Sequence, residues 1–231
     1  MQLNYEKIYQ RRFQDITVEK KLAAWAEIST WIHQKMGRPK TILDPAAGNL
    51  EFLNYVDAQE KWAVDLQKPV HLDPSDSRNK LHFLQGNIFE VQLPENYFQG
   101  IFISNFLEHL HTPEDIQNLL IKLRKSLTND GLLVIMGPNF KYCSSTYFDC
   151  ADHRLALSHI SVEEHLYATG YDIVKTIPKF LPYSFRSRLP SSASLVRLYL
   201  RVPLAWKFLG KQFLIFARKE ANPETNAGTK L

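Results

Sequence analysis

The stretch Thr41-Ile-Leu-Asp-Pro-Ala-Ala-Gly-Asn-Leu50 decides the fold. Its short apolar run ends at an Asp-Pro pair and passes into small residues, which is typical of a buried strand that enters a tight turn. The same pattern recurs around Trp62–Asp65, Leu81–Leu84 and Ile101–Ile103. Each run is apolar along its length, as expected for strands that are covered on both faces of a parallel sheet.

Helical segments alternate with these strands. Residues 15–36 carry apolar side chains at the spacing of an amphipathic helix, with Asp15 or Thr17 as its cap. Pro113–Leu127 has a single apolar stripe, and Ser161–Thr169 opens with a Ser-Val-Glu-Glu capping-box sequence. Three further strands are predicted, at Leu132–Met136, Tyr171–Ile177 and Gln212–Ala217. Regular alternation of strand and helix predicts an α/β, Rossmann-like, doubly wound sheet.

Size and composition agree with a folded protein. The chain has 231 residues, of which 45% are hydrophobic and 23% are charged, and these values exclude a disordered or fibrous chain. We predict a single domain over residues 1–219, with a core at about 37–180 and a disordered tail at 220–231.

Several features predict a cytoplasmic location. Cys143 and Cys150 are too few to staple a chain of this size, and they fit a reducing compartment. The N-terminus lacks the apolar run of a signal peptide, and no apolar stretch approaches the ~20 residues of a membrane-spanning helix.

The net charge of +4 conceals a strong segregation of charge. Between Ile173 and Lys219 the chain has ten basic and no acidic residues, so the remainder carries a net charge of −6. The basic segment 175–211 contains an insertion, 181–210, between the last two predicted strands. We interpret the body as acidic and the C-terminal segment as strongly basic.

The basic segment 175–211 has three interpretations. It is a solvated helical face with its apolar side chains packed inward, an amphipathic helix on an anionic membrane surface or lipid-linked substrate, or a patch for a polyanion. Nucleic acid is not favoured, because the basic residues are too sparse for a groove that tracks phosphates. In the membrane interpretation, the apolar face consists of Leu195, Leu198, Tyr199, Val202, Leu204, Trp206, Phe208 and Leu209. The side chains that meet the headgroups are then Arg197, Arg201 and Lys207.

Four strand ends carry the candidate binding residues, because ligands of doubly wound sheets bind at the carboxyl ends of the strands. Asp44 and Gly48 follow the first strand, and only one glycine of the G-x-G-x-x-G pattern is present, so a pyrophosphate is not favoured. Asp65 ends the second strand, where a carboxylate accepts hydrogen bonds from both hydroxyls of a ribose. Asn87 follows the third strand and suits an adenine amine. Asn105 follows the fourth strand and is expected to border the opposite side of the ligand.

These residues resemble the class I S-adenosylmethionine-dependent methyltransferases of the type-11 kind, which are related to ubiquinone-biosynthesis methyltransferases. The resemblance covers residues 40–175. The segments that carry it are Ile42–Gly48, Val64–Leu66, Gly86–Ile88, Phe98–Leu110 and Leu127–Ile135.

The resemblance implies a seven-stranded, mostly parallel sheet and S-adenosyl-L-methionine as the cofactor. It places Ala46 and Gly48 against the methionine part, Asp65 on the ribose, and Asn87 with Ile88 at the adenine. The other residues expected at the cofactor are Asp44, Leu66, Asn105 and Tyr9.

The sequence departs from the family pattern at two places. The outer glycines of the usual Gly-x-Gly-x-Gly loop are replaced by Ala46 and Leu50, and the latter puts the path of the loop in doubt. The usual adenine-binding Asp is Asn87, which keeps an acceptor for the adenine amine.

Three residues after the fifth strand are predicted to be catalytic: His153, Tyr142 and Tyr147. Methyl transfer needs a nucleophile aligned with the sulfonium, and a proton acceptor if the nucleophile is a hydroxyl. His153 is the predicted general base because its unperturbed pKa lies near neutrality. The alternatives are a hydrogen bond from His153 that holds its loop, and core packing of the two tyrosines.

Glu108 and His109 open the helix after the fourth strand and are interpreted as structural. No metal site is predicted, because Cys143, Cys150 and His153 lack a Cys-x-x-Cys spacing and an evident fourth ligand.

The predicted function is methyl transfer from S-adenosylmethionine to a small-molecule, lipid-linked or glycan acceptor. Two alternatives come from other classes of protein. One is a nicotinamide-dependent oxidoreductase on a similar sheet, against which the missing glycine pattern argues. The other is a cofactor-binding module without catalysis. The sequence leaves the acceptor and the oligomeric state open.

Overall fold

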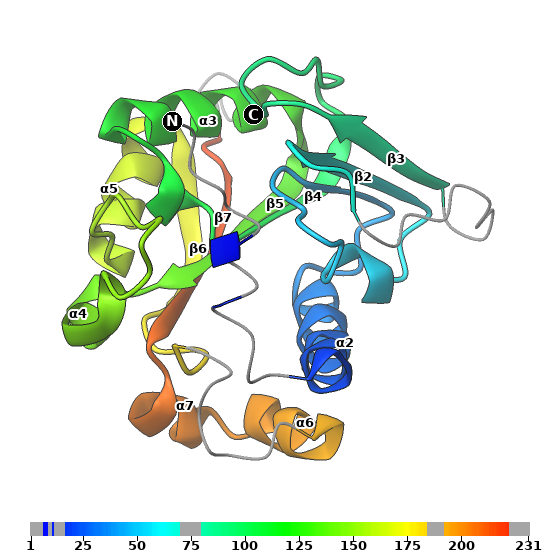
Figure 1. Ribbon diagram of the computed structural model, residues 1–231. Coiled ribbons are helices and arrows are strands. Elements are labelled where there is room, and N and C mark those ends of the chain that lie inside the picture. Colours follow the sequence, from blue (N-terminus) through cyan, green and yellow to red (C-terminus); the bar gives the residue numbers. More distant parts are fainter. Residues whose placement is uncertain (1–6, 9–10, 12–16, 70–79, 184–191, 222–231) are drawn as a thin grey trace, which may run out of the picture.

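The computed structural model describes residues 7–8, 11, 17–69, 80–183 and 192–221. Seven strands form one sheet in the order β3-β2-β1-β4-β5-β7-β6 (Figure 1). β1 to β5 pair in parallel with one another, and β7 runs antiparallel to both of its neighbours, β5 and β6. The predicted doubly wound, seven-stranded and mostly parallel sheet is therefore confirmed.

The strands lie where the apolar runs predict them. Their bounds are β1 Thr41–Asp44, β2 Glu60–Asp65, β3 Lys80–Gln85, β4 Phe98–Ser104, β5 Leu127–Pro138, β6 Tyr171–Ile177 and β7 Gln212–Lys219. The largest difference is at β5, which begins at Leu127 and not at Leu132 as predicted. Leu127 pairs with Phe98, and a register shift then separates this pair from the regular pairing that starts at Gly100. Residues 128–131, which lie within this strand but are polar or glycine, hid the early pairing from the sequence pattern.

The helices cover both faces of the sheet (Figure 1). Their bounds are α2 Val18–Lys35, α3 Pro113–Ser126, α4 Phe140–Tyr147, α5 His159–Ala168, α6 Ala193–Arg201 and α7 Pro203–Leu209, with 3₁₀ turns η1 Leu53–Tyr55 and η2 Leu107–His109. Thr112 caps α3 through a capping box with Asp115. The predicted start of α5 at Ser161 was wrong, because the helix begins at His159. Ser158 is its N-cap, and Ser161 is the third residue of the helix, whose side chain completes the capping box by accepting a hydrogen bond from the backbone N–H of Ser158.

Alternate residues of the strands enter two separate cores. In β5, Val134 packs on one face, whereas Leu133 and Ile135 pack on the other. One core lies under α2, α6 and α7, and the other lies under α3 and α5. Because both faces are buried, the strands need apolar side chains at successive positions, and this explains their continuous apolar runs.

The insertion between β6 and β7 folds as α6 and α7, beside α2 (Figure 1). Trp206 of α7 is only 8% exposed and packs against Trp31 and Phe180. Arg197 of α6 forms a two-bond ion pair with Glu27 of α2, with N···O distances of 2.8 and 2.6 Å. The insertion is therefore anchored to the body of the protein.

This packing corrects the apolar face expected for a membrane helix. Trp206 and Tyr199 face inward, the latter through a hydrogen bond from its hydroxyl to the carbonyl oxygen of Phe180. Arg197 is paired with Glu27, although its side chain stays 59% exposed. The outward apolar side chains are Leu195, Leu198, Val202, Leu204, Phe208 and Leu209.

Two sequence expectations concern chain segments that the structure does not describe. Tyr9 lies outside the described residues, so its predicted place over the cofactor stays a prediction. The same holds for residues 222–231 of the predicted tail.

Candidate functional site

The strand order brings the four predicted strand ends to one edge of the sheet. β3, β2, β1 and β4 are neighbours in that order and run parallel, so their carboxyl ends lie side by side. The chain direction across the sheet reverses between β1 and β4, which is the switch point where doubly wound sheets bind ligands. Asp44, Asp65, Asn87 and Asn105 all lie at or just after these ends.

The loop after β1 keeps a glycine-like path although two of its expected glycines are absent. Gly48 has φ +52° and is exposed, and a Cβ at this position would meet only Glu51 Oε2, at 3.5 Å. Leu50 also has positive φ, +64°, which is uncommon for a bulky residue. Its side chain is 2% exposed and packs in the core under α2. Burial therefore compensates for the strained backbone, and the doubt about the loop path is resolved.

Asp65 connects this loop to β2. Its Oδ2 accepts a hydrogen bond from Gly48 N–H at 2.8 Å, and its Oδ1 accepts one from Gln67 N–H at 3.0 Å. Burial raises the pKa of its carboxyl, and the backbone donors partly oppose this shift. The carboxylate stands at the position where the resemblance expects a ribose.

Asp44 lies behind the same loop and is 3% exposed. Burial raises the pKa of its carboxyl to about 8, and the charges of Asp65 and Glu51 add to this shift. Lys21 of α2 forms an ion pair with Glu51 at 2.6 Å. Three carboxyl groups thus gather around one loop. Glu51 is paired with Lys21 and the raised pKa of Asp44 keeps it largely protonated at neutral pH, so Asp65 supplies the negative charge that favours a positively charged ligand.

The remaining cofactor candidates border this region. Asn87 Oδ1 accepts a hydrogen bond from Phe89 N–H at 3.1 Å and so holds the turn after β3, while Ile88 is 3% exposed. Asn105 has φ +48° and donates its N–H to Met136 O, which ties it to β5. Leu66 is 66% exposed at the margin of the site. The structure brings all of the described candidates to one edge of the sheet.

The three predicted catalytic residues have different surroundings. Tyr147 is fully buried: its hydroxyl donates to Leu155 O at 2.7 Å and accepts from Leu157 N–H at 3.3 Å. Burial raises the pKa of this hydroxyl far above its ordinary value. This geometry favours the packing alternative for Tyr147. Tyr142 is half-buried, with Lys179 Nζ 4.5 Å from the centre of its ring.

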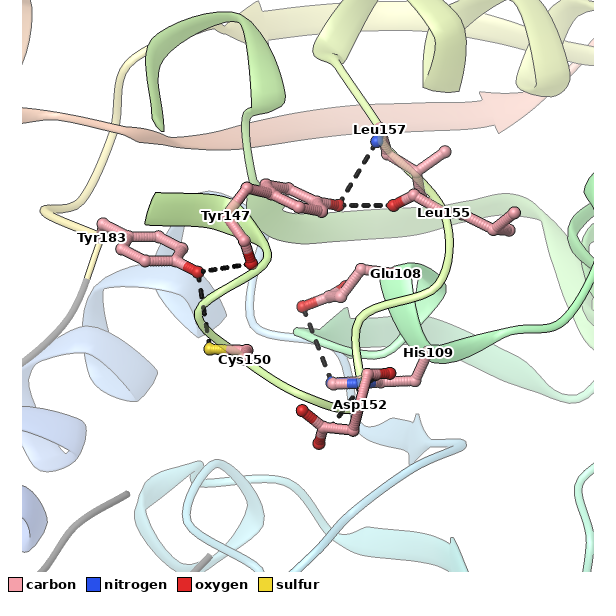
Figure 2. A network of polar contacts seen from close by, with 8 residues as sticks. All are labelled: Glu108, His109, Tyr147, Cys150, Asp152, Leu155, Leu157 and Tyr183. Atoms are coloured by element: carbon pink, nitrogen blue, oxygen red, sulfur yellow. Dashed lines mark hydrogen bonds and ion pairs between the residues drawn. The ribbon is translucent and has the colours of Figure 1, made fainter. Parts of the chain in front are cut away.

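His153 lies in a cluster that the sequence analysis did not assemble. Glu108 and His109 lie in the 3₁₀ helix η2 that follows β4, and this helix is separate from α3. The N–H groups of Arg154 and Leu155 both donate to the carbonyl oxygen of Glu108, at 2.8 and 3.2 Å. These bonds bring His153 against His109, with ring centroids 5.1 Å apart. Figure 2 shows Glu108, His109 and Asp152 in this network. Residues so distant in sequence give no local signal of their contact.

A cavity of about 710 Å³ lies between α2, α4, the end of β6, α6 and α7. Its described lining has no acidic side chain and five basic ones, Lys35, Lys175, Lys179, Arg201 and Lys207. None of the described cofactor candidates lines it, but Tyr142 does. The cavity is therefore separate from the loop after β1 that carries Asp44 and Glu51, which we call the acidic loop, and it suits a different, anionic ligand.

A family model described as a methyltransferase domain matches residues 43–135. This segment runs from β1 into β5 and contains the acidic loop and the four strand ends. A comparison with the curated proteins found no match to the sequence.

Solved structures of methyltransferases share the fold. A SAM-dependent methyltransferase from Archaeoglobus fulgidus is 19% identical, with a TM-score of 0.64 over 94% of this chain and 100% of that one. The 1,6-didemethyltoxoflavin-N1-methyltransferase of Burkholderia thailandensis, solved with 1,6-didemethyltoxoflavin and S-adenosylhomocysteine, is 21% identical, with a TM-score of 0.58 over 94% and 89%. An S-adenosylmethionine-dependent methyltransferase from Clostridium acetobutylicum ATCC 824 is 12% identical, with a TM-score of 0.64 over 94% and 98%.

The site fits the cofactor that these proteins share. Gly48 leaves open space for close approach, the Asp65 carboxylate suits a ribose, and the acidic surroundings of Asp44 suit a sulfonium and an ammonium group. Residues 43–135 therefore match a methyltransferase domain, and the described part of the chain has the class I fold of the S-adenosylmethionine-dependent methyltransferases.

Proposed function

We propose that this protein is an S-adenosylmethionine-dependent methyltransferase that modifies a hydroxylated acceptor carried by an anionic lipid at a membrane surface. The observation that carries the proposal is that α6 and α7 contribute both to a cation-lined cavity and to an exposed apolar surface. A lipid-linked acceptor has an anionic headgroup that fits the cation-lined cavity, and its bilayer environment fits the exposed apolar surface.

The cavity supplies the anion-binding part. Five basic side chains without an acidic neighbour in the described lining favour a phosphate or diphosphate, because charge-assisted hydrogen bonds to such groups are strong. Trp31, Tyr142 and Trp206 add aromatic surface for the attached group. Tyr142 lies on α4, which follows β5 directly, and so connects the cavity with the predicted catalytic region.

The outward side chains of α6 and α7 supply the membrane-facing part. We call Leu195, Leu198, Val202, Leu204, Phe208 and Leu209 the α6–α7 surface. Phe208 is 79% exposed and Leu204 is 61% exposed, although both are strongly apolar. Arg201 and Lys207 lie on the same two helices, and a basic residue near an anionic membrane contributes about 1 kcal/mol. Within the part of the chain that the structure describes, no helix is long and apolar enough to cross a membrane.

The chain's own residues bind and orient the cofactor and the acceptor, and they exclude water. S-adenosylmethionine supplies a methyl group already activated on a sulfonium, so the protein needs to align the acceptor rather than activate the donor. Asp65 and the loop at Gly48 hold the nucleoside end, and the cavity lined by Lys179 and Arg201 holds the anionic end of the acceptor. His153 lies beside the buried Glu108, where an acceptor hydroxyl would lose its proton.

Vesicle co-sedimentation tests the membrane part. We expect the full chain to bind vesicles that contain phosphatidylglycerol, and to bind phosphatidylcholine vesicles or high-salt samples far more weakly. Phe208→Ser should weaken binding several-fold. Tyr167→Ser is the matched control, because Tyr167 is an aromatic residue that is 81% exposed on α5. Binding that is insensitive to salt and to Phe208→Ser would contradict the proposal.

Release of S-adenosylhomocysteine tests the acceptor. We would compare the same sugar as a polyprenyl-diphosphate conjugate, as a sugar diphosphate and in free form. The lipid-linked form should be methylated best and the free form least. The double variant Lys175→Gln, Lys179→Gln should reduce the preference for the two phosphorylated forms. Equal rates with all three forms would overturn the assignment of the cavity.

A further inference from the structure

We propose that Glu108, His109 and His153 bind a divalent transition-metal ion, which positions an acceptor hydroxyl for methyl transfer. Each of the three residues offers one ligand atom, and these atoms all lie within 4.8 Å of one another. The metal assignment stands on this geometry. Its role in catalysis rests on the hydroxylated acceptor of the proposed function.

Backbone hydrogen bonds hold the three residues together. Glu108 and His109 are neighbours in η2, and the loop that contains His153 is bonded to the carbonyl oxygen of Glu108 through Arg154 and Leu155. Ligands of one ion, each about 2.1 Å from it, lie roughly 3–3.5 Å apart. Small rotations of the side chains therefore close the site around an ion.

The hydrogen bonding of His109 prepares its free nitrogen for a metal. Its Nδ1 lies 3.0 Å from the carbonyl oxygen of Asp152 and 3.5 Å from Asp152 Oδ2. A carbonyl oxygen only accepts, so Nδ1 carries the hydrogen, and in the neutral ring Nε2 keeps its lone pair. Metal-binding histidines are generally oriented in this way by a carbonyl or carboxylate on the opposite nitrogen. Figure 2 shows Asp152 against His109 in this role.

The lone pair of His109 faces a carboxylate. His109 Nε2 lies 3.9 Å from Glu108 Oε1, and the Glu108 side chain is 3% exposed. With the proton on Nδ1, the two atoms offer two ligands to the same space, where a divalent ion can bind both of them. The His109 side chain is 19% exposed and His153 is half-buried, so one side of the site stays open to a further ligand.

The ligand set indicates the kind of metal. Two imidazoles and one carboxylate suit Zn²⁺ or Fe²⁺, whereas Mg²⁺ and Ca²⁺ prefer oxygen ligands alone. Three protein ligands leave a position for a substrate oxygen. His153 then acts as a ligand, in contrast to the general-base role predicted from the sequence.

An ion at this place would lower the pKa of a bound hydroxyl. The hydroxyl proton leaves to solvent, and the oxygen forms the new bond to the methyl carbon. The sulfur keeps the electron pair of the bond that breaks, which leaves S-adenosylhomocysteine. The step needs no oxidant or reductant, and Zn²⁺ supports it as well as other divalent ions.

Calorimetric titration of the chelator-treated full chain with Zn²⁺ and Co²⁺ tests the site without acceptor or cofactor. We expect one equivalent to bind, with visible Co²⁺ absorption typical of nitrogen and oxygen ligands. Glu108→Gln and His153→Gln should each weaken binding about 100-fold, since loss of even an outer-shell partner costs roughly 10–100-fold. His111→Gln is the matched control, because His111 is an exposed imidazole two residues from His109.

Circular dichroism would show whether the buried Glu108→Gln substitution impairs folding. If it does, His153→Gln is the decisive variant, because His153 is partly exposed. The inference is overturned if folded wild-type protein binds no stoichiometric Zn²⁺ or Co²⁺, or if His153→Gln binds as wild type does. Methyl transfer that persists in metal-free protein also overturns it and leaves the lipid-linked acceptor intact. Metal binding without methyl transfer to the lipid-linked acceptor would leave the metal site intact and overturn the proposed acceptor.

Discussion

The carboxylate of Asp65 accepts a hydrogen bond from the backbone N–H of Gly48, with 2.8 Å between Oδ2 and N. This bond ties the end of β2 to the loop after β1. A second bond, from Gln67 N–H to Oδ1, holds the other oxygen. The carboxylate predicted to bind the ribose is thus oriented by the protein itself, which reduces the entropy lost when a ligand binds.

Asp65→Ala should weaken binding of S-adenosylhomocysteine by roughly 10–100-fold, because a hydrogen bond to a charged group contributes about 1.5–3 kcal/mol. Asp65→Asn should lie between this variant and the wild type, since its amide retains one acceptor oxygen. Isothermal titration calorimetry measures both. Affinity of Asp65→Ala equal to that of the wild type would contradict the ribose assignment.

Asp44→Asn should flatten the pH dependence of stability. Burial raises the pKa of the Asp44 carboxyl from 3.8 to about 8, so the folded protein retains a proton that the unfolded chain releases. The stabilising effect of this proton is complete below about pH 4 and is lost as the pH rises to about 8. Asparagine has the same shape and does not titrate. Urea unfolding across this range measures the slope, and equal slopes in both proteins would be evidence against a protonated Asp44.

Leu50→Gly should destabilise the protein although glycine suits the positive φ at this position. Loss of a buried leucine side chain costs about 2–5 kcal/mol, whereas relief of the left-handed backbone returns only about 1–2 kcal/mol. Leu50→Ala is the matched comparison: it loses nearly the same burial but keeps the strain, so it should be less stable than Leu50→Gly. The reverse order in urea unfolding would show that strain at Leu50 is negligible.

Tyr147→Phe should lower the free energy of unfolding by about 1–3 kcal/mol, because Leu155 O and Leu157 N–H lose a buried partner. Thermal and urea unfolding measure this loss, and steady-state kinetics of the same variant separate the two roles. If kcat instead fell about 100-fold with unchanged stability, the catalytic role predicted for Tyr147 from the sequence would be supported.

Much of the fold was predictable because it follows from local patterns. The apolar runs that end at Asp44, Asp65 and Asn105 mark β1, β2 and β4, and Thr112 marks the start of α3. The predictions failed where distant contacts override local preference. The early start of β5 depends on pairing of Leu127 with Phe98. The short helix α4, which was not predicted, contains Cys143 with non-helical backbone angles, and its sequence has no clear helical period.

The candidate cofactor site was predictable for a related reason. In a parallel sheet each strand end is marked in the sequence, and the doubly wound order brings those ends together. The contact of His153 with Glu108 and His109 has no such mark, because it depends on how the loop after α4 folds back on η2. The same applies to the cavity, whose basic residues come from α2, β6, the residues after β6, α6 and α7.

The sequence by itself determined the sheet, the candidate cofactor residues at its strand ends and the segregation of basic residues into the C-terminal part of the chain. It did so because burial on both faces, turn chemistry and charge are properties of consecutive residues. Only the tertiary structure decided that Arg197 pairs with Glu27, that Trp206 packs inward while Phe208 stays exposed, and that two histidines meet at a buried glutamate. These outcomes depend on the packing of segments far apart in the chain, where the geometry of the whole fold selects each side chain's partner.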